Sequence, residues 1–158
     1  MDDSNEFIIR EIFLKKTDAV DGEERIITQF HMINWPDHGW LFCKVFFILF
    51  NFFIMLGVPD NIDPIIEMLD CVHSKLNESS NGEDQYLVTH CSAGCGRTGT
   101  IIALDYCWNL IKAGKLPNDF SPFSIGKMLR RQRTAMIQTF VCQCEFLFNI
   151  VKFTFFFH

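Results

Sequence analysis

The sequence has no excess of positive charge, since its formal net charge is −5 at pH 7. General nucleic-acid-binding proteins need a basic surface, so we expect no nucleic-acid partner. The first 20 residues include Asp2, Asp3 and Glu6 but no apolar signal core, and we therefore expect no secretory peptide. Internal repeats are also absent, and the only linker-like tract is residues 77–84. A chain of 158 residues with these properties fits one domain with a buried core.

The seven cysteines form neither a disulfide framework nor a metal site. Their number is odd, and the pair Cys142 and Cys144 has no second pair at metal-ligand spacing. We expect no metal and no organic cofactor. Thiols without disulfide partners favour a reducing compartment, which predicts a cytoplasmic protein.

What the sequence does contain is a loop that combines a nucleophile with an anion site. Residues 90–99 read His-Cys-Ser-Ala-Gly-Cys-Gly-Arg-Thr-Gly, with five positions between Cys91 and Arg97. This spacing lets backbone N–H groups and the Arg97 guanidinium face the sulfur, and Arg97 can donate to two oxygens of one phosphate. We call residues 91–97 the nucleophile loop. The residues expected to contact a bound oxyanion are Cys91, Ser92, Ala93, Gly94, Cys95, Gly96 and Arg97.

A helix is expected directly after the nucleophile loop, from Thr98 to Ala113, ended by Gly114. The positive end of this helix would point back into the loop. A thiol placed there should have its pKa lowered by about two to four units from its ordinary value of about 8.5. The apolar residues expected on the buried face of the helix are Ile101, Leu104, Trp108 and Ile111.

The nucleophile loop resembles the signature of the cysteine-dependent phosphatases, and the longer run from His90 to Gly99 resembles the protein tyrosine phosphatases. The resemblance implies that Cys91 attacks phosphorus and that Thr98 assists breakdown of the phosphocysteine. His90 immediately precedes Cys91, so we expect it to support the loop by hydrogen bonding. The alternative, a structural cysteine in a glycine turn, does not account for Cys, Arg and Thr at this spacing.

Two further motifs complete the resemblance. Trp35-Pro36-Asp37 resembles the general-acid loop of tyrosine phosphatases, with Asp37 as the acid that protonates the tyrosine oxygen. Gln138 resembles the glutamine that orients the hydrolytic water in this family. The family's second glutamine is replaced here by Cys142. Asp37 and Gln138 are therefore added to the residues expected to contact the substrate.

The sequence of residues 104–117, 120–124 and 128–133 resembles the PEST-type non-receptor tyrosine phosphatases, and the resemblance covers most of residues 5–151. It implies an α/β fold, with a mixed β-sheet flanked by helices, and phosphotyrosine-containing proteins as partners. The family's upstream phosphotyrosine-recognition loop has no counterpart before Asn5, so residues 1–158 are expected to form a partial domain. Residues 153–158 form an atypical tail without a family motif. The sequence predicts no oligomeric state.

Residues 40–57 form an apolar insertion in the general-acid loop, which we call the apolar segment. Without it, Gly39 would run directly into Val58, as the family's loop does. A membrane span is one interpretation, but residues 40–56 only reach the lower limit of spanning length and include Lys44. A span would also separate Asp37 from Cys91 across a bilayer. We therefore favour a disruptive insertion over a membrane span.

The remaining patterns predict a coarse secondary structure. Alternating apolar residues predict strands at residues 7–15 and 25–34, and a short buried strand at residues 86–89 that leads to Cys91. Helical spacing predicts helices at residues 64–76, 124–133 and 144–152.

The function that these observations favour is hydrolysis of phosphotyrosine through a phosphocysteine intermediate. Two alternatives stay open: a non-catalytic phosphotyrosine-binding or misfolded truncated product, and a dual-specificity phosphatase. The first alternative follows from the interrupted acid loop. The second would need a shallower pocket, and the motifs at Asp37 and Gln138 argue against it.

Overall fold

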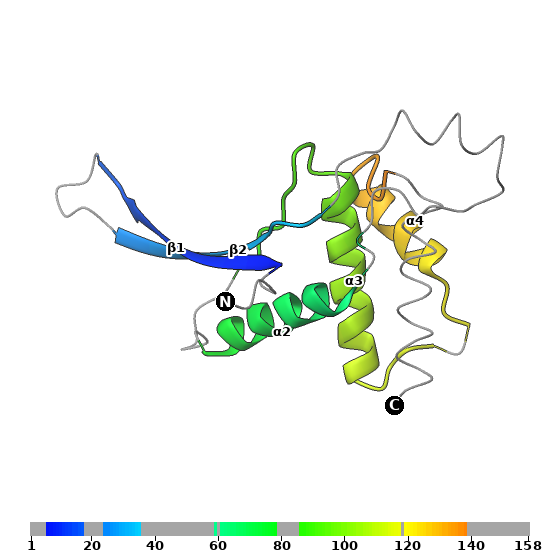
Figure 1. Ribbon diagram of the computed structural model, residues 1–158. Coiled ribbons are helices and arrows are strands. Elements are labelled where there is room, and N and C mark those ends of the chain that lie inside the picture. Colours follow the sequence, from blue (N-terminus) through cyan, green and yellow to red (C-terminus); the bar gives the residue numbers. More distant parts are fainter. Residues whose placement is uncertain are drawn as a thin grey trace, which may run out of the picture. The chain divides into compact units, whose positions relative to one another are not determined.

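The computed structural model of the chain describes residues 6–17, 24–35, 59, 61–78, 86–117 and 119–138 (Figure 1). In chain order their elements are β1 (Phe7–Lys15), β2 (Glu24–Met32), α2 (Asp63–Glu78), α3 (Gly96–Lys112) and α4 (Pro122–Gln132). They fall into two compact units, one with β1, β2 and α2 and the other with α3 and α4. The predicted acid Asp37, the apolar segment, the predicted helix at 144–152 and the tail at 153–158 lie outside the described residues.

Strands β1 and β2 form an antiparallel hairpin, which confirms both predicted strands. The register pairs Ile12 with Ile27 and Phe13 with Ile26. Because successive side chains point to opposite faces of a strand, these pairs place apolar side chains on both faces of the hairpin. All four are exposed, Phe13 to 73%. A two-stranded hairpin is marginally stable alone, so its stability in this unit depends on packing against the neighbouring helix.

Helix α2 supplies the core of the first unit and confirms the helix predicted at residues 64–76. A turn precedes the helix, in which the side-chain oxygen of Asn61 accepts a hydrogen bond from the Asp63 N–H (N···O 3.0 Å). The helix contacts β2. Its buried residues recur at helical spacing: Ile65, Met68, Leu69 and Val72. Trp35 is also buried, so the residue before Pro36 and Asp37 is anchored.

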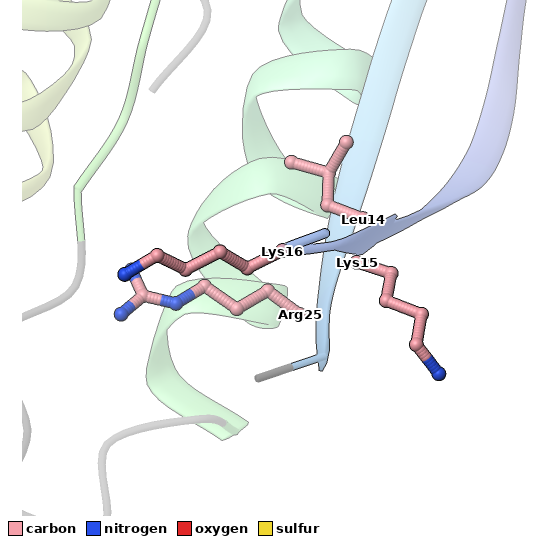
Figure 2. A pocket seen from close by; sticks show the side chains of 4 residues that line it. All are labelled: Leu14, Lys15, Lys16 and Arg25. Carbon is pink, nitrogen blue, oxygen red and sulfur yellow. The ribbon is translucent and has the colours of Figure 1, made fainter. Parts of the chain in front are cut away.

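The end of the hairpin carries a shallow basic pocket of about 350 Å³. Figure 2 shows the Lys16 and Arg25 side chains extending to the same side, whereas Lys15 points away. Lys15 forms an exposed ion pair with Glu24 (Nζ···Oε1 2.9 Å). Leu14 completes the lining, so this pocket contains none of the predicted site residues.

Helix α3 confirms the helix predicted after the nucleophile loop, and Gly114 ends it in the left-handed region (φ 62°). The predicted buried face is only partly right. Leu104 is buried, but Ile101, Trp108 and Ile111 are half-exposed. The side that is most buried carries small residues, Gly99, Thr100 and Ala103. Small side chains let α4 and the chain after it approach α3 closely, and this packing outweighs the pattern of large apolar residues.

Helix α4 confirms the helix predicted at residues 124–133, with Pro122 in its first turn. Its buried residues, Ile125, Gly126 and Leu129, lie on the side that packs in this unit. The next five residues return to the N-terminal end of α3, which makes α4 part of the support of the nucleophile loop (Figure 1).

The strand predicted at residues 86–89 is wrong, because this segment is neither a strand nor buried. Tyr86 is 82% exposed and Val88 is 81% exposed. A strand needs a hydrogen-bonded neighbour, and no strand among the described residues pairs with this segment. The part of the chain that the structure describes contains no helix long and apolar enough to cross a bilayer.

Candidate active site

The nucleophile loop leads directly into α3, as predicted. Residues 92–95 form consecutive bends, Cys95 is the N-cap residue, and the helix begins at Gly96. Gly94 adopts φ +67°, a left-handed conformation that side chains rarely tolerate. The glycine therefore permits the curl that brings the backbone N–H groups around Cys91.

The pKa of Cys91 is lowered from 9.0 to about 7. Burial by itself raises the pKa of this thiol, because it disfavours the thiolate. Hydrogen bonds to the thiolate outweigh burial; they come from the Thr98 hydroxyl and from the backbone N–H groups of Thr98, Cys95 and Gly94. The loop thus favours a negative charge at Cys91, in the direction that the sequence predicts.

Thr98 and Arg97 both lie in the first turn of α3. The Thr98 hydroxyl is buried and makes no hydrogen bond of regular geometry within the described part of the chain, so it can donate fully once Cys91 is a thiolate or binds an anion. Arg97 is half-buried, two residues after the N-cap. The positive end of the helix and these two side chains belong to the same turn, which favours anions there.

The other loop residues differ in exposure. Ser92 and Ala93 are exposed, Gly94 and Cys95 are half-buried, and Gly96 is buried. The Cys95 thiol donates to the Ala93 carbonyl (S···O 3.3 Å), an exposed hydrogen bond across the bend. His90 is exposed, with Nδ1 3.5 Å from the Cys91 carbonyl oxygen, at the limit of a hydrogen bond. A supporting role for His90 remains a prediction.

Gln138 follows a segment that is tied to the nucleophile loop. The Ile137 N–H donates to the Cys95 carbonyl (N···O 3.2 Å). Arg130 of α4 donates to the carbonyls of Met136 (Nε···O 2.8 Å) and Ile137 (Nη2···O 2.7 Å). These bonds place the residue before Gln138 against the N-cap of α3. The structure therefore brings Cys91, Arg97, Thr98 and Gln138 into one unit.

The backbone of this segment is strained. Ala135 (φ 62°) and Ile137 (φ 57°) occupy the left-handed region, which is unusual for any side chain and most unfavourable for a β-branched one. Such conformations cost about 1–3 kcal/mol and persist only where their surroundings hold them. Here the bonds from Arg130 and to Cys95, together with full burial of Ile137, hold the turn.

Gly99 makes the close approach possible. A Cβ placed on Gly99 would lie 2.5 Å from the Ile137 nitrogen and 3.3 Å from the Met136 carbonyl carbon. Real Cβ atoms do not approach backbone atoms so closely. Only glycine therefore fits at this position of α3 without displacing the segment before Gln138.

Comparison with known proteins decides the family. The protein-tyrosine phosphatase family model matches residues 1–152. The chain belongs to the protein-tyrosine phosphatases.

Its relatives include both non-receptor and receptor-type tyrosine phosphatases. Human tyrosine-protein phosphatase non-receptor type 12 is 37% identical over 134 residues, which are 85% of this chain and 14% of that protein. Human non-receptor type 18 is 33% identical over 82% of this chain and 23% of its own length. Chicken receptor-type tyrosine-protein phosphatase eta is 33% identical over 88% of this chain and 8% of its own length. The non-receptor relatives agree with the predicted PEST-type subfamily, and the chain spans less than a quarter of each of these relatives.

Several residues of this tyrosine phosphatase site were missed at the level of sequence. Arg130 and Arg133 belong to the basic run of residues 130–133, whose composition alone predicts no contact for either side chain. Gly99 and Ile137 gave no signal, because their importance arises from a close approach between residues distant in sequence. Among the described residues no group of His, Cys, Asp or Glu could hold a metal ion.

The lowered pKa of Cys91 predicts selective alkylation by iodoacetate. At pH 6 a thiol of pKa 7 has about 100 times the thiolate fraction of a thiol of pKa 9, while its lower basicity reduces its nucleophilicity about tenfold. Cys91 should therefore react about ten times faster than an ordinary exposed thiol. Its rate should rise with pH to a plateau above about 7.

Cys107 is the internal control for this experiment. Burial raises its pKa to about 12, so it should stay unmodified over the same pH range. Peptide mass analysis after timed quenching measures both rates in one sample. A Cys91 rate no higher than that of Cys71, which is half-buried like Cys91, would show that the loop does not stabilise a thiolate.

Proposed function

We propose that this chain hydrolyses phosphotyrosine in proteins through a phosphocysteine intermediate on Cys91. The observation that carries the proposal is the set of hydrogen-bond donors around the Cys91 sulfur. Donors that stabilise a thiolate also suit the oxygens of a phosphate and the charge that develops on them during transfer. Family membership supports the same reaction.

In the first step, the Cys91 thiolate attacks phosphorus as the bond from phosphorus to the tyrosine oxygen breaks. The loop N–H groups and Arg97 bind the three other oxygens of the phosphoryl group, and Ser92, Ala93, Gly94, Cys95 and Gly96 supply the backbone. Where the acid loop is uninterrupted, Asp37 donates its proton to the tyrosine oxygen, which leaves as neutral phenol.

In the second step, water attacks the phosphocysteine and the sulfur–phosphorus bond breaks. Gln138 orients the water, Asp37 accepts its proton, and the Thr98 hydroxyl stabilises the departing thiolate. The Thr98 hydroxyl lowers the Cys91 pKa by hydrogen bonding to the thiolate, which supports this role for Thr98. The chemistry requires no metal and no organic cofactor.

A cysteine that must remain a thiolate favours a reducing compartment, so we place the protein in the cytoplasm, acting in phosphotyrosine signalling. The complete domain would have the mixed sheet flanked by helices that the family resemblance implies, and residues 1–158 would form a part of it. Residues 40–57 would be an insertion in its acid loop.

Direct trapping of the intermediate tests this function. After rapid mixing with a phosphotyrosine peptide and acid quenching, mass analysis should find phosphate on Cys91 and not on Cys95. A phosphoserine peptide of the same sequence should give no such adduct, whereas a dual-specificity phosphatase would accept both. Binding of the peptide without any adduct would instead identify a non-catalytic phosphotyrosine-binding chain.

A further inference from the structure

Arg133, at the C-terminal end of α4, lies against the nucleophile loop. It is the C-cap residue of that helix, and its N–H donates to the Leu129 carbonyl (N···O 3.0 Å). Its side chain extends to Gly94: the guanidinium Nη2 lies 3.1 Å, and Cζ 3.6 Å, from the position that a Cβ on Gly94 would occupy. The guanidinium therefore covers the open side of this glycine.

Gly94 is a critical point of the loop. Its backbone N–H is one of the donors to the Cys91 thiolate, and this orientation requires the left-handed conformation at φ +67°. A flexible glycine would lose much conformational freedom by holding this geometry. A planar group packed on its open side restricts the alternatives, so Arg133 is placed to reduce that cost.

The three arginines of residues 130–133 have different roles. Arg130 uses its guanidinium to hold the carbonyls of Met136 and Ile137. Arg133 makes no ion pair with a carboxylate among the residues that the structure describes. Its charge beside Gly94 is therefore not neutralised by the described part of the chain. Arg131 is exposed and contacts neither the loop nor the segment before Gln138 in any described interaction, which makes it a matched control.

We propose that Arg133 is a positioning residue of this site: its guanidinium holds the Gly94 peptide in place and adds a positive charge beside the loop that receives the phosphate. It acts through Gly94 and through its charge, without direct contact with the reacting atoms. The inference deepens the proposed phosphatase function and rests on it, since it assigns a role at the same site.

The test uses the whole chain and two readouts that need no turnover. One is the pH dependence of Cys91 alkylation, and the other is the protection of Cys91 from alkylation by tungstate, a phosphate-like oxyanion. Arg133→Met removes the charge and keeps much of the side-chain bulk. It should raise the pKa of Cys91 by about 0.5 to 1 unit and weaken tungstate protection about three- to tenfold, because the Gly94 N–H that donates to the thiolate is held less well and a positive charge beside the loop is lost.

Two further variants separate positioning from general effects. Arg133→Lys keeps the charge but has no planar group to cover Gly94, so it should recover most of the pKa shift and only part of the protection. Arg131→Met removes one charge from the same helix end and should match the parent chain in both readouts. Urea unfolding of each variant identifies any variant that fails to fold. If Arg133→Met does not fold, the comparison of Cys91 alkylation and tungstate protection between Arg133→Lys and Arg131→Met decides the role of Arg133.

Unchanged alkylation and protection in Arg133→Met, or equal changes in Arg131→Met, would overturn the role of Arg133. A different result would overturn the proposed phosphatase function: tungstate would fail to protect Cys91 in the parent chain. The pH profile of alkylation would still decide the role of Arg133 in that case, because it depends only on the thiolate.

Discussion

Replacing Gly99 by alanine should destabilise the chain and disrupt the site at Gln138 together. The new Cβ would lie 2.5 Å from the Ile137 nitrogen, and this backbone atom cannot yield easily, because it bonds to the Cys95 carbonyl. Overpacking of this kind costs about 1–3 kcal/mol. Alanine gains about 1 kcal/mol over glycine inside a helix, so we expect a net loss in the free energy of unfolding.

The functional effect of Gly99→Ala should exceed its effect on stability. Pushing residues 136 and 137 away from α3 would break the bond to Cys95, displace Gln138 and disturb the Cys95 N–H that faces Cys91. A displacement of about 1 Å at a catalytic group can cost about 100-fold in rate. Turnover of an aryl phosphate and tungstate protection of Cys91 measure this effect, and urea unfolding measures stability.

Gly114→Ala is the control for this prediction. Gly114 also has a positive φ (62°), but a Cβ there would meet nothing within 4 Å. Its replacement should cost about 1 kcal/mol of stability through backbone strain and leave Cys91 unchanged. If Gly99→Ala behaves like Gly114→Ala, with full protection of Cys91, the contact between α3 and Ile137 does not support the site.

Much of the site could be predicted from sequence because its chemistry is local. Cys91, Arg97 and Thr98 lie within one loop and the first helical turn, so their spacing alone indicates a thiolate and an anion site, and the lowered Cys91 pKa agrees. The helices and the hairpin were also predictable, because each has its own apolar period and its own start or stop residue.

The parts that sequence did not predict depend on packing between distant residues. The buried side of α3 is set by small residues that admit Ile137, whereas periodicity favours large ones such as Trp108. The exposed segment at residues 86–89 has the composition of a strand, but a strand forms only with a partner. Arg130 and Arg133 resemble any surface basic cluster until the fold places their guanidinium groups.

Deleting residues 40–57 should restore general-acid catalysis and increase turnover by about 10²–10⁴-fold. The deletion joins Gly39 to Val58, as in the related acid loops, and would let Asp37 reach the leaving oxygen. The nucleophile loop is built from residues 91–97 and the helix after it, so the insertion should leave oxyanion binding intact. We therefore expect the parent chain to bind tungstate as well as the deleted form but to turn over far less substrate.

The pH dependence of an aryl phosphatase assay separates these two forms. Cys91 must be deprotonated, so the activity of the parent chain should rise with pH through the Cys91 pKa of about 7. The deleted form requires Asp37 in its acid form as well as the Cys91 thiolate, so its profile alone should have a second, descending limb and be bell-shaped. Asp37→Asn in the deleted form should remove this second limb and return the rate to that of the parent chain.

Both forms should be compared alone and after fusion to the preceding half of a related tyrosine phosphatase domain, so that chain length does not decide the result. Equal rates and identical pH profiles would show that residues 40–57 are tolerated beside a working acid loop. Recovery of the parent chain only from detergent-extracted membranes, with residues 40–56 protected from protease, would favour a membrane span instead. If deletion increases turnover and Asp37→Asn removes that increase, residues 40–57 interrupt the acid loop. Neither a tolerated insertion nor a membrane span predicts this result, because it assigns the lost activity to proton transfer from the Asp37 carboxyl group.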